Sequence, residues 1–181
     1  GVVIFCPPRD RESVSVRTLA LAGAHQFVFQ DMLDASTAVA RAVAAARRDC
    51  AAEVVVRQLA PLIPLEVHSV LHAVASHPES ATTVSEVATL LGVNRKTLAN
   101  RCSRCRCLQP TELINWCRVA LVAQLLVTTG STVEAIGIAL GFPSHTSLRN
   151  LIRRYTGRRA TDIRASGTGV VLAALEARLH A

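Results

Sequence analysis

The stretch "TTVSEVATLLGVNRKTLANRCSRC" (residues 82–105) decides the fold, because its apolar residues recur at helical spacing and then stop at a glycine. Gly92 can take the left-handed backbone that ends a helix, and Asn94 can cap a following helix. The residues that set the first helical pattern are Val84, Val87, Ala88, Leu90 and Leu91. The stretch therefore predicts a helix, a tight turn and a second helix.

The second predicted helix has one apolar and one polar side. Leu98 and Cys102 fall on the side that we expect to face a core. The opposite side carries Arg95, Lys96, Thr97, Asn100, Arg101 and Arg104. In the major groove of DNA, arginine pairs with guanine and asparagine pairs with adenine through paired hydrogen bonds. We therefore interpret this helix as a candidate recognition helix.

The same pattern occurs again in "STVEAIGIALGFPSHTSLRNLIRRYTG" (residues 131–157). Gly141 supplies the turn, and Ser144 supplies the cap of the second helix. The residues expected to face the core are Leu148, Leu151 and Ile152. The polar residues on the other side are His145, Thr146, Arg149, Asn150, Arg153 and Arg154. The sequence thus predicts two helix pairs of one design.

A long apolar segment separates the two pairs and predicts a shared helix from Pro110 to near Gly130. The charges follow the same division of the chain. Residues 1–81 hold seven Lys and Arg against eight Asp and Glu, a net charge of −1, whereas residues 82–164 hold twelve against four, a net charge of +8. A compact basic half is typical of a module that binds duplex nucleic acid.

Four pieces of this half carry a family resemblance: "LGVNRKTL", "IGIALGF", the closing "DIR", and the set Arg118, Ala120, Ala123, Leu125 and Leu126. Over about residues 82–164 they resemble the DNA-binding domain of the AraC/XylS transcription regulators. The resemblance implies seven helices with two helix-turn-helix units, whose recognition helices enter successive major-groove segments of double-stranded DNA. These helices would begin near Asn94 and Ser144. RNA polymerase is a further candidate partner.

The chain departs from that family pattern at several positions. It has Cys102, Leu148 and Ile152 where the family usually has phenylalanine, so we expect an aliphatic core and the same fold. Cys107 stands where the family favours glycine, and Ala160 stands where it favours proline. A cysteine held at positive φ would cost roughly 1 kcal/mol or more. We therefore expect a local difference in the turn after the first recognition helix.

Helix position suggests which residues contact phosphate and which read bases. We assign phosphate contacts to Arg95, Arg101, Arg104, Arg153, Arg154 and Arg158. We assign base readout to Lys96, Thr97, Asn100, His145, Thr146, Arg149 and Asn150. Two alternatives compete with DNA binding: a protein-interaction module with decayed DNA readout, and a DNA-repair alkyl acceptor. The second needs a thiolate with a positioned His and acid, and none of the six cysteines offers such a motif.

A cluster of cysteines invites a metal or redox interpretation: Cys102, Cys105, Cys107 and Cys117. Structural zinc sites present paired ligands on turns, whereas the first two of these cysteines are expected on a helix. His68 and His72 are four residues apart, but no third ligand is evident. We therefore predict no metal and no cofactor. Nearby arginines favour thiolate, so a redox switch on DNA binding is a hypothesis.

The N-terminal part has a different pattern. "VVIFC" (residues 2–6) and "HQFVF" (residues 25–29) predict strands, while residues 11–23 and 34–49 predict helices, the latter capped by Asp34. Strand and helix in alternation predict a parallel pair with helical cover. Parallel pairs of this kind need partners on their faces and edges.

The stretch "LALAGAHQFVFQD" (residues 19–31) resembles the second half of a response-regulator receiver domain. The chain would then begin inside a domain, near the fourth of five strands. The lysine expected after the last strand is Gln30 here, and the phosphate-accepting Asp would lie upstream. We therefore predict no phosphorylation site in this unit and expect it to serve in homodimerisation or signal relay.

Together these patterns predict a mainly α protein that is not an enzyme. Its parts are a partial receiver-like α/β unit (1–55), a linker and docking helix (56–81), an AraC-type double helix-turn-helix domain of seven helices (82–165) and a C-terminal helix (166–181). No apolar stretch reaches the roughly 18 residues that span a membrane, and no secretion signal is evident. We expect a cytoplasmic protein.

Overall fold

The computed structural model describes residues 2–6, 18, 24–29 and 35–181. The described part is mainly helical, which confirms that part of the predicted fold class. The chain divides into two compact units, Gly1–Ala51 and Ala52–Ala181, and each is described by itself.

The first unit contains two parallel strands, β1 (Val2–Cys6) and β2 (Ala24–Phe29), at the positions that the sequence predicts. Ile4 lies opposite Phe27, and the register shifts once, between Val2 and Val3. Of the helix predicted over residues 11–23 the structure describes residue 18 alone, which is helical, and the predicted cap Asp34 lies outside the described residues.

α2 (Ala35–Leu59) begins in the first unit and continues past its predicted end at Asp49. Between Ala35 and Pro61 the sequence contains no glycine or proline that would stop the helix earlier. The division between the two units therefore falls inside a continuous helix.

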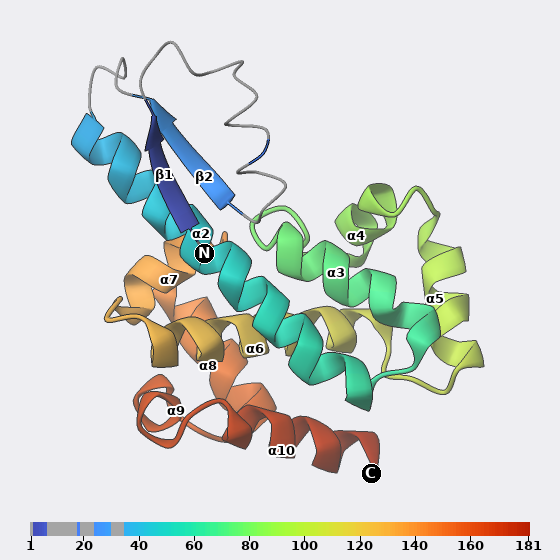
Figure 1. Cartoon of the computed structure of the whole chain (residues 1–181). Coiled ribbons are helices and arrows are strands. Elements are labelled where there is room, and N and C mark those ends of the chain that lie inside the picture. The colour runs from blue at the N-terminus through green and yellow to red at the C-terminus, as the bar shows by residue number, and fades with distance from the viewer. Residues whose placement is uncertain (1, 7–17, 19–23, 30–34) are drawn as a thin grey trace. The chain divides into compact units, whose positions relative to one another are not determined.

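The second unit is helical throughout (Figure 1). After two short 3-10 turns, η2 (Ala60–Leu62) and η3 (Leu65–Val67), its helices are α3 (His68–Ser76), α4 (Val84–Leu90), α5 (Arg95–Arg104), α6 (Pro110–Thr128), α7 (Val133–Ala139), α8 (His145–Thr156), α9 (Ala160–Ser166) and α10 (Gly169–Leu179).

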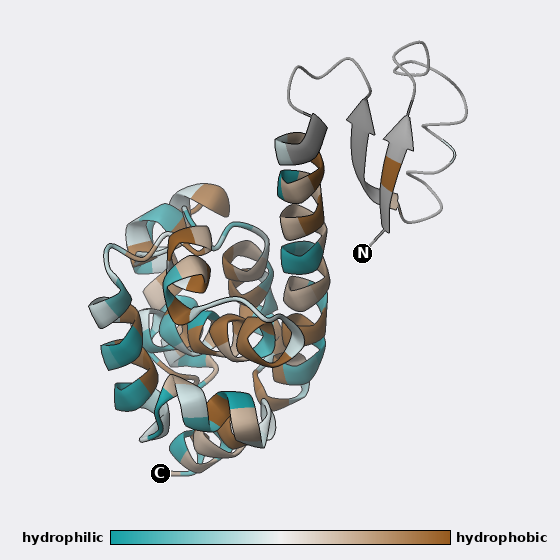
Figure 2. Ribbon diagram, turned by 90° about the vertical axis from the view of Figure 1, so that its left-hand side faces the viewer, coloured by the Kyte–Doolittle hydropathy of each residue, from teal (hydrophilic) through white to brown (hydrophobic). Residues whose placement is uncertain are grey.

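The helix α6 is the spine of this unit, as its apolar sequence predicts. It contacts both helix pairs, α4–α5 and α7–α8, and also packs on α3, α9 and α10. Hydrophobic residues gather where these helices face one another (Figure 2). Leu98, Leu148 and Ile152 are fully buried, and burying each such side chain stabilises the fold by about 1.5–3 kcal/mol. The core is therefore aliphatic, as expected from the sequence.

The expected seven helices within residues 82–165 are six in the structure, α4 to α9. The seventh helix of the same core is α3, which lies before residue 82 and packs on α6. It buries Val70, Leu71 and Val74 completely. This short helix lies in the segment predicted as a linker and docking helix (56–81), and its apolar face belongs to the core.

The helices α4 and α7 end in the same kind of turn. Gly92 and Gly141 have φ values of 63° and 68°. In each turn the glycine N–H donates to the carbonyl three residues earlier and the next N–H donates to the carbonyl five residues earlier, at 2.9–3.1 Å. This is a Schellman ending, which favours glycine at its left-handed position.

The turn after α5 has the same hydrogen bonds but no glycine. Cys107 N–H donates to the Cys102 carbonyl at 2.9 Å, and Arg106 N–H donates to the Ser103 carbonyl at 3.2 Å. The left-handed residue is Arg106, with φ 51°, so the expectation that Cys107 would carry the positive φ is wrong. The reason is that α5 ends at Arg104 and Cys105 is its C-cap. The left-handed position after the cap therefore falls on Arg106, one residue before Cys107.

Candidate nucleic-acid interface

The recognition-helix candidate α5 has the two sides that its sequence predicts. Leu98 and Cys102 are fully buried, while Asn94 caps the helix by accepting a hydrogen bond from the Thr97 N–H at 2.7 Å. The Thr97 hydroxyl donates to the same Asn94 oxygen at 3.0 Å, so part of its bonding capacity serves the cap. The exposed side chains of this face are Arg95, Lys96, Asn100, Arg101 and Arg104.

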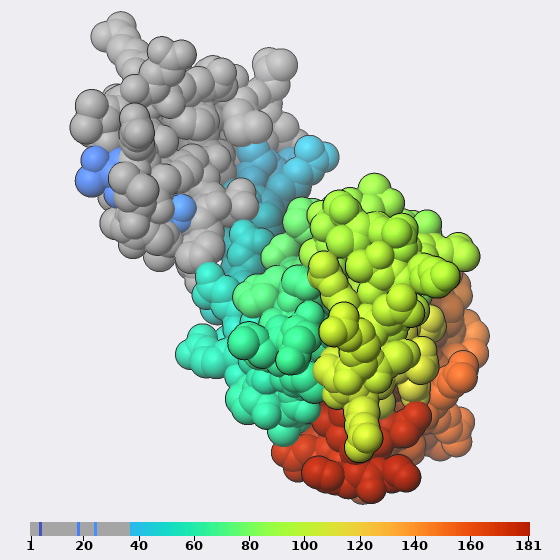
Figure 3. Space-filling model, turned by 90° about the vertical axis from the view of Figure 1, so that its right-hand side faces the viewer, coloured from blue at the N-terminus to red at the C-terminus, as the bar shows by residue number. Residues whose placement is uncertain are grey.

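The second candidate, α8, repeats this design. Ser144 and Ser147 form a reciprocal capping box at its start, and the Ser147 N–H donates to Ser144 Oγ at 3.1 Å. Leu148 and Ile152 are fully buried, and Leu151 is half-buried. The exposed residues are Ser144, His145, Thr146, Arg149, Asn150, Arg153 and Arg154. Residues of α4 and α5 cover much of one face of this unit in yellow-green, and residues of α7 and α8 lie along its edge in orange (Figure 3).

A groove of about 520 Å³ lies beside α8. Four arginines line it, together with Asn150: Arg149, Arg153, Arg158 and Arg159. The sequence interpretation missed Arg159, although the adjacent pair of arginines after Gly157 was a visible signal. Such a basic groove can hold phosphate oxygens of a DNA backbone next to base-reading side chains.

Arg154 lies on α8 but away from this groove. It does not line this groove but a separate cavity between α6, α8 and α10. The structure therefore does not bring Arg154 together with Arg149 and Arg153.

Arg149 has an acidic partner that the sequence interpretation also missed. Its Nη2 donates to Oε1 of Glu134, in the first turn of α7, at 2.6 Å. The pKa of Glu134 lies below its usual value, first because of a backbone hydrogen bond and then because of the charge of Arg149. Sequence alone could not show this pair, since the turn geometry decides which helix positions meet.

Arg118 is a buried charge that joins three parts of the second unit. Its Nη1 donates to the Pro78 carbonyl at 2.8 Å, and its Nη2 donates to the Leu140 carbonyl at 3.1 Å. Its guanidinium also lies 4.1 Å from the centre of the Phe142 ring. Burial lowers the pKa of Arg118. The residue thus fixes the α7–α8 turn to α6 and to the segment before α4.

The expectation that the cysteines favour the thiolate is wrong where the structure shows a shift. Burial raises the pKa of Cys102 to about 11 and that of Cys117 to about 12, and burial also raises the pKa of Cys107. These thiols stay protonated near neutrality because removing them from water penalises the charged form. The redox hypothesis therefore loses its physical basis at these three positions.

The histidines and cysteines of the described residues form no metal site. No group of three or more His, Cys, Asp or Glu side chains within the described ranges could hold a metal ion. His68 Nε2 instead contacts the carbonyls of Ala60 and Ile63, at 3.1 and 2.8 Å, and closes the turn before α3. Among the described helices, none is long and apolar enough to cross a membrane.

Comparisons with known proteins agree with this geometry. Residues 87–166 match the family model of a helix-turn-helix domain. A comparison with curated protein sequences finds no match. The chain is similar to a crystal structure of a DNA-binding transcriptional dual regulator from Escherichia coli K-12, with 19% sequence identity and a TM-score of 0.50, over 57% of this chain and 93% of that one. At this identity the likeness concerns the fold alone.

These comparisons do not support the receiver resemblance of residues 1–55, which stays a prediction. The family match and the shared fold together place a helix-turn-helix domain in residues 87–166.

Proposed function

We propose that the chain is a transcription regulator that binds double-stranded DNA by sequence, with α5 and α8 in successive segments of the major groove. The observation that carries this proposal is the repeated design of the two helices. Each is capped, buries an apolar side and exposes arginine and asparagine. The similar fold of the E. coli protein, a DNA-binding transcriptional dual regulator, supports the same class.

In this proposal, some of the exposed residues read bases and others contact phosphate. Lys96, Asn100, Arg149 and Asn150 read base edges, with His145 and Thr146 beside them at the start of α8. Phosphate contacts come from Arg95, Arg101, Arg104, Arg153, Arg158 and Arg159. The net charge of residues 82–164, twelve Lys and Arg against four Asp and Glu, makes the affinity depend on salt.

In-vitro selection of random DNA duplexes at near-physiological salt tests the proposal. We expect enrichment of a motif with two short blocks about one helical turn apart, because each recognition helix reads one block. Enrichment of a single block would mean that only one helix reads bases. Absence of enrichment would contradict the proposal.

A protein-interaction module is the second candidate, and an exposed apolar residue favours it. Ile138 is 80% exposed on α7, in the second helix pair. Such a side chain suits contact with another protein, and RNA polymerase is a candidate for that contact. The slope of log affinity against log salt separates the candidates, since a DNA binder loses affinity by about 0.9 log units per phosphate contact for each tenfold rise in salt.

For the first unit we propose homodimerisation. The sheet formed by the described residues has two strands, so each strand has an outer edge without a described partner strand. Light scattering at tens of micromolar tests this role. A monomeric mass would contradict it without affecting the proposal for the helix pairs.

A further inference from the structure

A cavity of about 300 Å³ lies in the second unit between α6, α8 and α10. Its lining residues are Glu112, Trp116, Arg154, Tyr155, Ala174 and Arg178. Two of them, Ala174 and Arg178, belong to α10, which begins after the helix-turn-helix match ends at residue 166. The cavity therefore depends on a helix that the matched domain does not include.

Trp116, one of the lining residues, contains a buried hydrogen-bond donor without an acceptor. Trp116 is 3% exposed, and within the described part of the chain its indole Nε1–H is the buried side-chain polar atom without a partner. A buried donor of this kind is costly and calls for an explanation. The Tyr155 ring meets the indole edge to face, with centroids 5.0 Å apart. The two rings give the cavity an aromatic wall.

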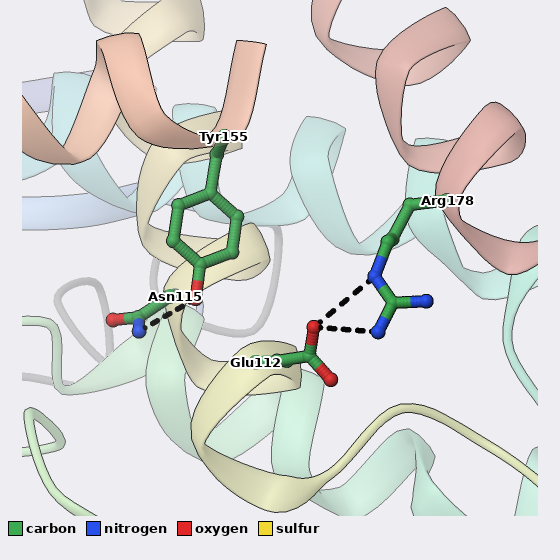
Figure 4. A network of polar contacts seen from close by, with 4 residues as sticks. All are labelled: Glu112, Asn115, Tyr155 and Arg178. Atoms are coloured by element: carbon green, nitrogen blue, oxygen red, sulfur yellow. Dashed lines mark hydrogen bonds and ion pairs between the residues drawn. The ribbon is translucent and has the colours of Figure 1, made fainter. Parts of the chain in front are cut away.

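The polar groups of the cavity carry an excess of positive charge. Arg178 donates from Nε and Nη2 to one oxygen of Glu112, at 3.2 and 2.9 Å (Figure 4). Arg154 has no ion-pair partner among the described side chains. Two guanidinium groups against one carboxylate leave a net charge of +1 around the cavity.

The Tyr155 hydroxyl adds a neutral donor to this set. It accepts a hydrogen bond from Asn115 Nδ2 at 2.9 Å, which leaves its own O–H proton for another acceptor (Figure 4). Tyr155 and Arg178 lie on either side of Glu112 in this view.

We propose that this cavity binds a small organic acid with one carboxylate and an aromatic or similarly apolar body. The carboxylate would pair with Arg154 and with the remaining N–H groups of Arg178, in the geometry that guanidinium groups favour. The body would lie against Trp116 and Tyr155, and the volume suits a molecule of this size. Because Glu112 leaves only one net positive charge, a monoanion fits better than a phosphate dianion.

Binding of the acid at this site would change the affinity for DNA. This part of the inference rests on the proposed function. Arg154 and Tyr155 are residues of α8, and α10 packs on α8. A ligand held between the two helices would therefore brace a recognition helix. By thermodynamic linkage, DNA and the acid would change each other's affinity by the same factor.

Trp116 makes the site directly measurable, because it is the one tryptophan of the chain. We would titrate the full chain with sodium benzoate and follow tryptophan fluorescence at constant ionic strength, without DNA. Benzamide is the neutral isostere, and sodium phosphate is the inorganic anion. We expect a saturable change with benzoate, none with benzamide and at least tenfold weaker binding of phosphate. No saturable change with benzoate, or equal responses to benzoate and benzamide, would overturn the proposal.

Matched variants then locate the site. Arg154→Gln and Arg178→Gln are each expected to weaken benzoate binding about tenfold, the effect of losing one charge-assisted interaction. Arg57→Gln removes an exposed arginine of α2 that lies outside both the cavity lining and the basic groove, and this variant is expected to bind benzoate as the wild type does. Circular dichroism checks that each variant is folded. Wild-type affinity in both Arg154→Gln and Arg178→Gln would refute the proposal, whatever the outcome of DNA selection.

Discussion

Arg149 and Glu134 form an ion pair across the second helix pair, with Nη2 of Arg149 2.6 Å from Oε1 of Glu134. Arg149 belongs to the recognition-helix candidate α8, and Glu134 to the first turn of α7. Both side chains are about half exposed, at 55% and 48%, so DNA could reach the guanidinium. The carboxylate thus holds the arginine fork in one orientation before DNA arrives.

Replacing this carboxylate by its amide should change how the chain chooses DNA. In Glu134→Gln we expect weaker preference at the base pair that we propose Arg149 reads, since the guanidinium loses the ion pair that orients it. We also expect roughly two- to fivefold higher affinity for random-sequence DNA, because a negative charge leaves the interface. Anisotropy titrations with selected and scrambled duplexes measure both effects. Glu176→Gln, which removes an exposed carboxylate of α10, is the control, and lower affinity of Glu134→Gln for random DNA would contradict the expectation.

Two arginines one helical turn apart on α8 offer a matched test of base against phosphate contact. Arg149→Ala should cost about 1–3 kcal/mol on the selected duplex and relax preference at one base pair. Arg153→Ala should weaken binding to all duplexes alike and reduce the salt slope by about 1. Affinities at several salt concentrations decide between these patterns. An equal loss on every sequence from Arg149→Ala would reassign that residue to phosphate.

The local signals in this sequence predicted the helix pairs well. The caps at Asn94 and Ser144 and the glycine turns depend on residues within a few positions of each other, so one sequence contains them. The contacts of Arg118 with the carbonyls of Pro78 and Leu140 join residues 40 and 22 positions apart, and no local pattern encodes them. The thiolate prediction failed because it weighed the charge of nearby arginines above burial, although the sequence had placed Cys102 on the inward side of its helix.

Arg118 should matter more for stability than any exposed arginine. Arg118→Ala leaves two carbonyls and the Phe142 ring without their partner, and we expect a loss of about 3 kcal/mol in the free energy of unfolding. Arg118→Lys should lose less, because an ammonium can satisfy one carbonyl but lacks the planar fork. Urea unfolding measures both. Arg101→Ala, an exposed position, is the control and should stay within about 0.5 kcal/mol of the wild type.

Arg106 carries backbone strain that glycine would relieve. Its φ of 51° lies in the left-handed region, where an L-residue pays about 1 kcal/mol relative to glycine. Arg106→Gly should therefore raise the free energy of unfolding by about 0.5–1 kcal/mol. Arg104→Gly, at the last residue of α5, should lower it, by less than the roughly 1 kcal/mol that glycine costs in a helix interior. Urea unfolding of the two variants tests whether glycine raises the free energy of unfolding at Arg106 and lowers it at Arg104. A lower free energy of unfolding in both variants would show that the turn is not strained.

Burial of the cysteine thiols predicts how stability depends on pH. The pKa of Cys102 is raised from 9.0 to about 11, so the folded state holds this proton more tightly than the unfolded state does. The resulting stabilisation is complete below about pH 9 and is lost as the pH rises towards 11. Cys102→Ala should flatten the fall of unfolding free energy over this window, measured by urea unfolding at several pH values. Iodoacetamide at pH 8 gives an independent check: it should label the exposed Cys50 and spare Cys102 until urea unfolds the chain. Rapid labelling of Cys102 in the folded protein would show that the thiol is not buried.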